Sequence, residues 1–344
     1  MASNHTPLYV GTLLDAHFVL KPLGLKEVMN KLIGPAQSSF TPIRLSTDNI
    51  LVVQEAVHSM RRKKGRKGWI LLKLDLEKAY DRIRWNFLED TLRASRLLES
   101  WIRWIMQCVM GPSMSLMWNG EKIEPFRPSR GLRQGDPLSP YLFVLCLERL
   151  CYQVEVAVVG KEWIPIHLSR GGPALWHICF ADDLILFAEA SVAQIRVIRK
   201  VVERFCNALG QKDKSKIFFS KNVHQDLVMQ ISDVNGIKAT KDLGKYLGMP
   251  VLHKRINTDT YGDVIERVTS RLLGWRSRFL SFAGHINLTK AVLISIRVHA
   301  MSTMLLPASI LERLDKLSRS FIRGSTIEKK ATFDFLEQSL LFQI

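Results

Sequence analysis

Residues 175–188 read LWHICFADDLILFA, and two adjacent acids in this stretch, Asp182 and Asp183, decide the expected fold. The apolar runs on either side, Leu175–Cys179 and Leu184–Ala188, predict two buried strands joined by a tight turn. Carboxylates held together at such a turn repel one another unless a cation neutralises them. The stretch therefore predicts a metal site, with a solvated turn as the alternative because Asp is common in turns.

A third acid favours the metal site over the turn. Trp69–Leu76 (WILLKLDL) is typical of another core strand, and Asp75 lies near its end. The next segment, KAYDR at residues 78–82, leads into an amphipathic helix. Mg²⁺ is usually held by one or two carboxylates plus substrate phosphates, and a pair of such ions can clamp the attacking and leaving oxygens of a phosphoryl transfer. Three acids in this arrangement indicate nucleotide-polymerase chemistry.

The composition indicates a folded protein with a polyanionic partner. The chain has 344 residues, of which 47% are hydrophobic, so we expect two or three subdomains with a packed core. Lys and Arg exceed Asp and Glu by 49 to 32, which gives a net charge of +17. Basic surface binds phosphate and releases counterions, although a merely soluble basic surface is the alternative. The excess is concentrated in one run: Arg61, Arg62, Lys63, Lys64, Arg66 and Lys67.

Cysteine, histidine and apolar patterns exclude several classes of protein. The five cysteines form no C-x-x-C pair, so we interpret them as core thiols in a reducing compartment. The histidines lack the spacing of a zinc site, and we expect no structural metal. The most apolar stretch, Ala291–Ile310, is interrupted by Arg297 and Pro307, so no membrane span is expected. We expect an intracellular protein, in the nucleus or cytoplasm.

Periodicity places further elements along the chain. Asn119-Gly120 between two alternating segments predicts a hairpin, and Ser139 is expected to cap a long helix that runs to about Val156. The basic run is expected to form a loop. The remaining expected elements are a helix over 46–60, a helix over 195–209 capped by Gly210, strands over 216–220 and 246–252, and a helical region from Thr258 onward.

These segments, in this order, resemble the reverse transcriptase domain of plant LINE-type non-LTR retrotransposons. Three ordered motifs carry the resemblance: LKLDLEKAYDRIRW (72–85) is similar to motif A, GLRQGDPLSPYLF (131–143) to motif B, and FADD (180–183) to motif C. Four weaker matches are LIGPAQSSF (32–40) with the late fingers, KSKIFFSKN (214–222) with motif D, KYLGMP (245–250) with the primer grip, and GWRSRFLSFAGHINLTKAVL (274–293) with the start of the thumb.

The resemblance implies roles for individual residues. Asp75, Asp182 and Asp183 would hold two Mg²⁺ ions, with Mn²⁺ as a substitute. Tyr80 would lie under the sugar and exclude a 2′-hydroxyl, with ordinary core packing as its alternative role. The other implied substrate contacts are Ala181 of motif C and the nucleotide-pocket residues Gln134 and Gly135 of motif B, and Lys214 would protonate the departing pyrophosphate.

The sequence also departs from the family pattern. The segment before Lys214 is short, so the motif D lysine could instead be Lys212 or Lys216, and a solvated lysine is an alternative. The Arg-Pro-Ile segment of the fingers has no counterpart in residues 1–31. No endonuclease, Cys/His-rich knuckle or RNase H module is recognisable, so we expect an excised or decayed copy.

The expected fold class is α+β, a right-hand polymerase with an antiparallel palm sheet. Its expected parts are partial fingers (1–68), a palm with motifs A to D and the primer grip (69–254), a helical thumb (255–324) and a divergent tail (325–344). The implied reaction is RNA-directed DNA synthesis, with an RNA template, a DNA primer and dNTP as partners and no membrane. Two alternatives remain open: a decayed relic that binds RNA or RNA–DNA hybrid without extending it, and an RNA-dependent RNA polymerase, against which Tyr80 argues.

Overall fold

The computed structural model describes residues 25–76, 78–209, 215–251, 261–274 and 280–323. The chain divides into two compact units, Met1–Leu247 and Gly248–Ile344. The helices of the first unit are α2 (Leu25–Leu32), α3 (Ser46–Arg62), α4 (Ala79–Arg82), α5 (Trp85–Ala94), α6 (Glu99–Met110), α7 (Ser139–Val159), α8 (Val192–Leu209) and α9 (Gln225–Asn235). Its strands are β1 (Trp69–Asp75), β2 (Met117–Trp118), β3 (Glu121–Lys122), β4 (Ile166–His167), β5 (Ala174–Leu175), β6 (His177–Phe180), β7 (Asp183–Glu189), β8 (Lys216–Phe219) and β9 (Lys245–Tyr246).

An antiparallel sheet of order β6-β7-β1-β8 forms the centre of the first unit. Strand β1 is apolar over nearly its whole length because it is an inner strand, paired with β7 on one side and β8 on the other. Its pairing with β7 runs from Trp69 opposite Glu189 to Asp75 opposite Asp183. This register brings the end of β1 beside the turn between β6 and β7.

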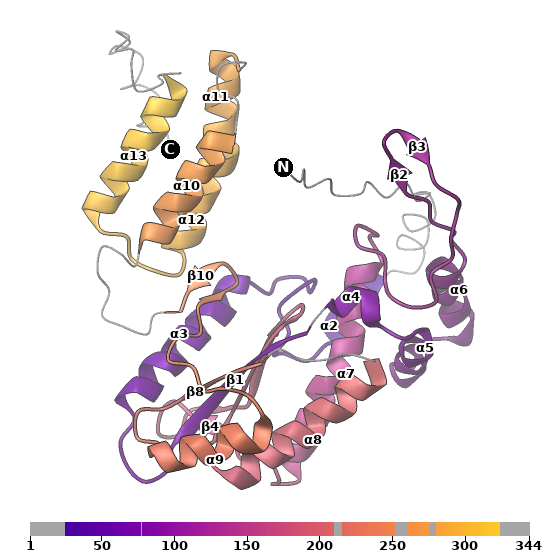
Figure 1. Ribbon diagram of the computed structural model, residues 1–344, viewed down its shortest axis with the longest axis vertical. Coiled ribbons are helices and arrows are strands. Elements are labelled where there is room, and N and C mark those ends of the chain that lie inside the picture. The colour runs from indigo at the N-terminus through magenta and orange to yellow at the C-terminus, as the bar shows by residue number, and fades with distance from the viewer. Residues whose placement is uncertain (1–24, 77, 210–214, 252–260, 275–279, 324–344) are drawn as a thin grey trace. The chain divides into compact units, whose positions relative to one another are not determined.

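Helices cover both faces of this sheet. Side chains alternate along a strand, so Ile70, Leu72 and Leu74 share one face, where they join a continuous core with buried residues of α7 and α8. Leu71 is equally buried on the opposite face. Figure 1 shows α3 on one side of the sheet and α7 with α8 on the other. The sequence therefore predicts an α+β class with an antiparallel sheet correctly.

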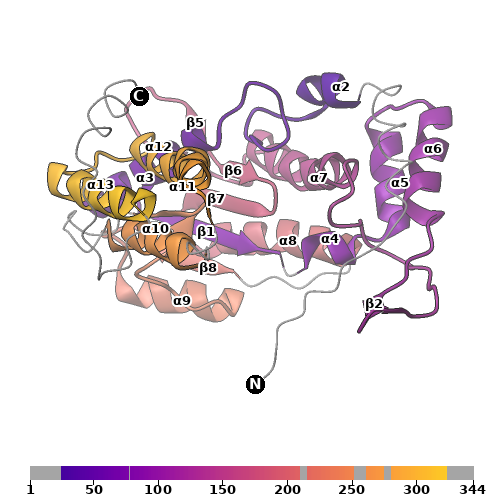
Figure 2. The same cartoon turned by 90° about the horizontal axis from the view of Figure 1, so that it is seen from above.

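The second unit is helical. It contains strand β10 (Met249–Pro250), helices α10 (Gly262–Gly274), α11 (Phe282–Leu288), α12 (Ile294–Met301) and α13 (Ala308–Ile322), and a π-helical segment η3 (Thr289–Leu293). Helix α10 contacts α12 and α13, and Figure 2 shows these helices side by side. The Tyr261 hydroxyl donates to the Leu305 carbonyl over 2.9 Å, and the rings of His285 and Phe321 lie 4.8 Å apart. The helical pattern expected beyond residue 258 is confirmed for the described part.

Several local expectations are confirmed. The Asn119-Gly120 hairpin joins β2 to β3, and both turn residues have positive φ, at 50° and 87°. Helix α8 buries Ile195, Ile198 and Phe205, the expected apolar stripe. The cap expected at Gly210 lies outside the described residues. In the described part of the chain, no helix is both long and apolar enough to cross a bilayer.

Three local expectations are wrong. Ser139 is the first residue of α7 and not its N-cap, because Leu138 occupies the cap and the Asp136 carboxylate accepts the Leu138 N–H at 2.9 Å. The basic run is not entirely a loop, since Arg61 and Arg62 form the last turn of α3. The apolar run before the acids is not one strand, because Ala174 and Leu175 pair with β4 before β6 begins.

Candidate catalytic site

The structure places the three sequence-predicted acids near one another, at the end of the two inner strands of the sheet. Asp75 ends β1 and lies directly opposite Asp183, the first residue of β7. Residues in directly opposite positions have Cβ atoms about 4.5–5.5 Å apart. Asp182 adjoins Asp183 in the two-residue turn that follows Phe180, and it is exposed. The register thus places three acids where two strands end, although their carboxylate oxygens do not all lie within 4.8 Å of one another. Carboxylates are ligands that suit a hard divalent cation.

The turn that presents these acids is strained and externally supported. Ala181 has φ 51°, a left-handed conformation that costs an L-residue about 1–2 kcal/mol. Its backbone N–H donates to Ser39 Oγ at 2.8 Å and to Gln37 Oε1 at 3.2 Å. Both acceptors are buried, and Gln37 Oε1 also accepts from the Ser39 hydroxyl at 2.8 Å. The segment before α3 therefore holds the turn in place.

A lysine side chain partly neutralises the acid cluster. Lys73 lies two residues before Asp75 on the same face of β1, and its Nζ is 3.7 Å from Asp183 Oδ1. The same Nζ donates to the Lys245 carbonyl at 2.7 Å. The pKa of Asp183 is nevertheless raised, first by burial, which outweighs the lowering by Lys73, and further by the neighbouring Asp182 and Asp75 carboxylates. A cation would relieve this accumulation of negative charge.

Tyr80 lies near this cluster. It belongs to the short helix α4, and its half-buried ring stacks on Phe143 of α7 with centroids 4.5 Å apart and planes 15° apart. Burial raises the pKa of Tyr80 to about 12, and the negative charge of Asp182 acts in the same direction. The phenol is therefore neutral at physiological pH. Its ring is fixed by packing, which a steric gate and a simple core residue would both require.

The motif B loop is attached to the turn that carries Tyr80. The Leu132 N–H donates to the Tyr80 carbonyl at 2.8 Å, and the Gly131 N–H donates to the Ile83 carbonyl at 2.7 Å. Farther along this loop, Gln134 and Gly135 are exposed. Neighbouring residues brace the loop, since the Arg133 guanidinium pairs with Asp136 at 2.5 Å and donates to the Cys108 carbonyl at 2.9 Å.

The basic run lies at the other end of β1 from the acids. It precedes Trp69, whereas Asp75 ends the strand, so about 20 Å of extended chain separates the two features. Part of its charge is engaged within the protein: Lys63 Nζ lies 3.7 Å from the centre of the Trp69 ring, and Lys67 pairs with Glu189 at 3.1 Å. Lys64 and Arg66 are exposed. The run therefore cannot contact the same phosphate as the acids.

Sequence reasoning did not identify every residue at the site. Lys214, the expected motif D lysine, and its alternative Lys212 lie outside the described residues. Gln37, Ser39 and Lys73 were not assigned a role. For Lys73 a signal existed, because a residue two positions before Asp75 shares its face of the strand. Gln37 and Ser39 gave no comparable signal, since they are more than a hundred residues from Ala181.

The chain matches a family model over most of its length and several curated proteins over parts of theirs. Residues 19–251, more than half of the chain, match the family described as reverse transcriptase (RNA-dependent DNA polymerase). The Pol polyprotein from type-2 retrotransposable element R2DM of Drosophila melanogaster is 27% identical over 305 residues, which cover 84% of this chain and 27% of that protein. A putative ribonuclease H protein of Arabidopsis thaliana is 67% identical over 82 residues, which cover 24% of this chain and 13% of that protein. The chain thus spans less than a third of the length of these curated relatives.

Among solved structures, telomerase from Candida tropicalis in complex with a fragment of telomeric RNA covers 91% of this chain and 47% of its own, at 12% identity and a TM-score of 0.46. The expected kinship with non-LTR retrotransposon reverse transcriptases and the expected right-hand polymerase fold are confirmed by the family match and the retrotransposon relatives. Enzymes of this kind act on nucleic acid and generally use divalent metal ions. On the match over residues 19–251, this chain belongs to the reverse transcriptase (RNA-dependent DNA polymerase) family.

Proposed function

We propose that this chain catalyses RNA-directed DNA synthesis at the acid cluster formed by β1 and the β6–β7 turn. One observation carries the proposal: Asp75 lies opposite Asp183 in the strand register, and Asp182 adjoins it. The raised pKa of Asp183 supports it: burial is the main cause and the neighbouring Asp182 and Asp75 carboxylates add to it, so a bound cation would stabilise the ionised form.

Asp75, Asp182 and Asp183 would hold two Mg²⁺ ions, or Mn²⁺ in their place. When bound, these ions would activate the primer 3′-hydroxyl and neutralise the pyrophosphate that leaves. The remaining residues position the substrate. We assign Tyr80 to the sugar of the dNTP, and we assign Ala181, Gln134 and Gly135 to the nucleotide pocket. Lys214 is proposed, on the motif D resemblance, to protonate the leaving group.

The proposed substrates are an RNA template, a DNA primer and dNTP. The net charge of +17 supports a polyanionic partner. We assign residues 1–68 to partial fingers, 69–254 to the palm, 255–324 to the thumb and 325–344 to a divergent tail. The basic run would contact nucleic acid away from the reacting phosphate, since it lies at the far end of β1.

Primer extension on poly(rA) with oligo(dT), dTTP and Mg²⁺ tests the proposal. Asp182→Asn removes charge but little volume, and it should lower the extension rate by about 10³-fold or more, the loss expected for several kcal/mol of charge stabilisation. Asp75→Asn should behave alike, and the double variant should be no worse than either single, because residues that act as a unit are non-additive. Asp233→Asn, on the exposed side of α9, is the matched control and should leave the rate unchanged.

Two outcomes would contradict the proposal. Primer extension by Asp182→Asn at the wild-type rate would show that the acids do not take part in the reaction. Hybrid binding by the wild-type chain without any extension, with Mg²⁺ or Mn²⁺, would favour the decayed relic over the polymerase.

A further inference from the structure

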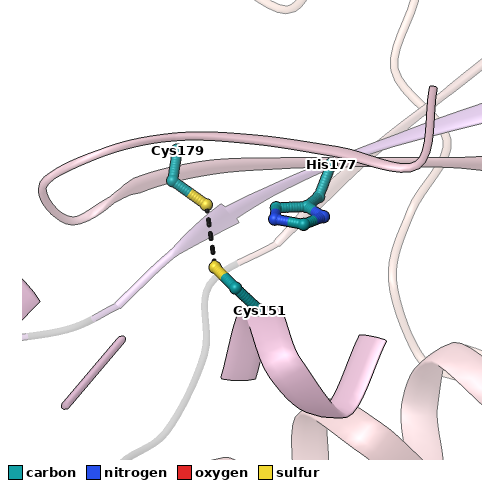
Figure 3. A group of neighbouring side chains, drawn as sticks. All are labelled: Cys151, His177 and Cys179. Atoms are coloured by element: carbon teal, nitrogen blue, oxygen red, sulfur yellow. Dashed lines mark hydrogen bonds between the residues drawn. The ribbon is translucent and has the colours of Figure 1, made fainter. Parts of the chain in front are cut away.

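A second cluster of potential metal ligands lies on the face of the sheet opposite the acids. His177 and Cys179 are two residues apart on β6, so their side chains share one face, and Cys151 points toward them from α7 (Figure 3). One ligand atom from each of the three residues lies within 4.8 Å of the other two. The sulfurs of Cys151 and Cys179 are 3.3 Å apart.

This cluster is enclosed, and its histidine interacts with Cys151 but has one buried nitrogen without a hydrogen bond of normal geometry among the described residues. Cys179 is fully buried and Cys151 is 5% exposed. His177 Nδ1 is also buried, and it has no hydrogen bond of normal geometry in the described part of the chain. A buried polar atom without a partner costs about 1–3 kcal/mol, so native proteins normally satisfy it with a bound water or ligand.

The residue types of this cluster, two cysteines and one histidine, suit a zinc ion. Thiolate and neutral imidazole are the ligands that Zn²⁺ prefers.

We propose that Cys151, His177 and Cys179 bind one Zn²⁺ ion. Glu148, which lies one helical turn before Cys151 on α7, would supply the fourth ligand only after a movement of its side chain, because it is outside the group of ligand atoms that lie within 4.8 Å of one another. One Glu148 oxygen, Oε1, accepts the Gly34 N–H at 3.0 Å.

The two sulfurs form a hydrogen-bonded pair, and their separation is closer to that of a zinc site than to that of a disulfide. Two thiolates on one tetrahedral Zn²⁺, each at about 2.3 Å, are roughly 3.8 Å apart. A disulfide requires about 2.05 Å. The observed 3.3 Å is therefore about 0.5 Å from the zinc geometry and more than twice as far from the disulfide. Zinc binding requires the smaller movement, together with loss of the protons from the Cys151 and Cys179 thiols.

The site would connect the catalytic turn to α7. Cys179 lies two residues before Ala181, and its carbonyl accepts from Asn49 Nδ2 at 2.9 Å and from the Ser38 N–H at 3.1 Å. An ion held between β6 and α7 would fix this strand from its other face. It would not take part in nucleotidyl transfer, because its ligands point away from the acids. We expected no structural metal from the sequence because the histidines lack the spacing of a zinc site, and Cys151 comes from a different segment than His177 and Cys179.

Metal analysis of the full chain tests the proposal. Protein purified without chelator should contain about one Zn²⁺ per chain. Cys151→Ser and Cys179→Ser should lose most of this metal, whereas Cys146→Ser, a buried cysteine on the same helix outside the cluster, should retain it. Metal-free wild type titrated with Co²⁺ should develop the visible absorption of tetrahedral cobalt and a sulfur charge-transfer band, and added Zn²⁺ should abolish both. The cobalt readout needs no variant, so it decides the question even if a serine variant fails to fold.

Three results would overturn the proposal. The first is a wild-type chain that neither purifies with zinc nor binds Co²⁺. The second is unchanged zinc content in folded Cys151→Ser. The third is a Cys151–Cys179 disulfide found by mass spectrometry in protein kept under mild reducing conditions, which would identify a redox pair instead.

Discussion

Replacement of Gly131 by Ala should separate the motif B loop from the short helix α4, which carries Tyr80. The Gly131 backbone is held at both of its polar groups: its N–H donates to the Ile83 carbonyl at 2.7 Å, and its carbonyl accepts from Trp85 Nε1 at 2.9 Å. A Cβ at this position would lie 2.7 Å from the Asp81 carbonyl oxygen, which is backbone and cannot rotate away. The loop or the helix must therefore move.

The expected loss of stability is about 3–4 kcal/mol. Gly131 has φ 88°, and a left-handed conformation costs an L-residue about 1–2 kcal/mol. Moving the loop away from Asp81 breaks two hydrogen bonds, each worth about 1 kcal/mol net. Gly120 provides the matched control, because its φ is 87° but no atom lies within 4 Å of its Cβ position. Gly120→Ala should therefore cost only the first 1–2 kcal/mol.

Chemical denaturation of both variants measures this difference, and dTTP titration in the primer-extension assay gives its functional consequence. We expect Gly131→Ala to be less stable than Gly120→Ala by about 2 kcal/mol, with a raised KM for dTTP because the loop carrying Gln134 is displaced. Equal stability of the two variants would refute the claim that close backbone approach, and not φ alone, requires glycine at position 131. An unchanged KM in a destabilised Gly131→Ala would refute the link between this loop and the nucleotide pocket.

Three further perturbations test other parts of the site. Tyr80→Val should raise the rate of ribonucleotide incorporation relative to deoxynucleotide incorporation by roughly tenfold. Tyr80→Phe keeps the ring stacked on Phe143 and should not change this ratio. An equal decrease in the incorporation of both substrates would indicate that Tyr80 has a packing role alone. Because the pKa of Asp183 is raised, its ionisation destabilises the metal-free fold as pH increases through that pKa. At pH 7, Mg²⁺ should therefore raise the Tm of the wild-type protein more than the Tm of Asp183→Asn. An equal gain in Tm for the two proteins would contradict this reasoning. Alanine at Lys64 and Arg66 should weaken the salt dependence of RNA–DNA hybrid binding. The slope of the logarithm of the binding constant against the logarithm of salt concentration should fall in magnitude by up to about 0.9 for each phosphate that the protein no longer neutralises. An unchanged slope would exclude both residues from the interface.

Much of the fold could be predicted because its strongest patterns are local. Strand β1 and helix α8 carry long apolar periodicities, and the Asn119-Gly120 turn has the residue types that positive φ requires. The start of α7 could not be predicted in the same way. Ser139 is a good N-cap by type, but the Asp136 side chain already satisfies the backbone there, and this depends on the path of the preceding loop.

In the candidate site too, the residues with a local sequence signal could be predicted and those that act over long range could not. The acids could be identified because two of them are adjacent in sequence and the third ends a recognisable strand. The residues that support the turn could not be identified, because Gln37 and Ser39 contact Ala181 across more than a hundred residues of sequence. No periodicity in the sequence predicts such a contact. The same limit applies to Cys151, which meets His177 and Cys179 only once α7 packs against β6.

The strain at Ala181 explains why this distant support matters to the chemistry. A glycine would adopt φ 51° at no cost, but alanine gives up about 1–2 kcal/mol there, so the local sequence does not by itself hold the turn in this conformation. Its single N–H is shared between two acceptors, a hydrogen bond is worth about 1 kcal/mol net, and both acceptors are side chains fixed in the segment before α3. The position of Asp182 therefore depends on that segment as much as on motif C. Since the proposed two-metal catalysis would require carboxylates placed to within about 0.5 Å, we expect a change near Gln37 to slow the reaction without altering an acid.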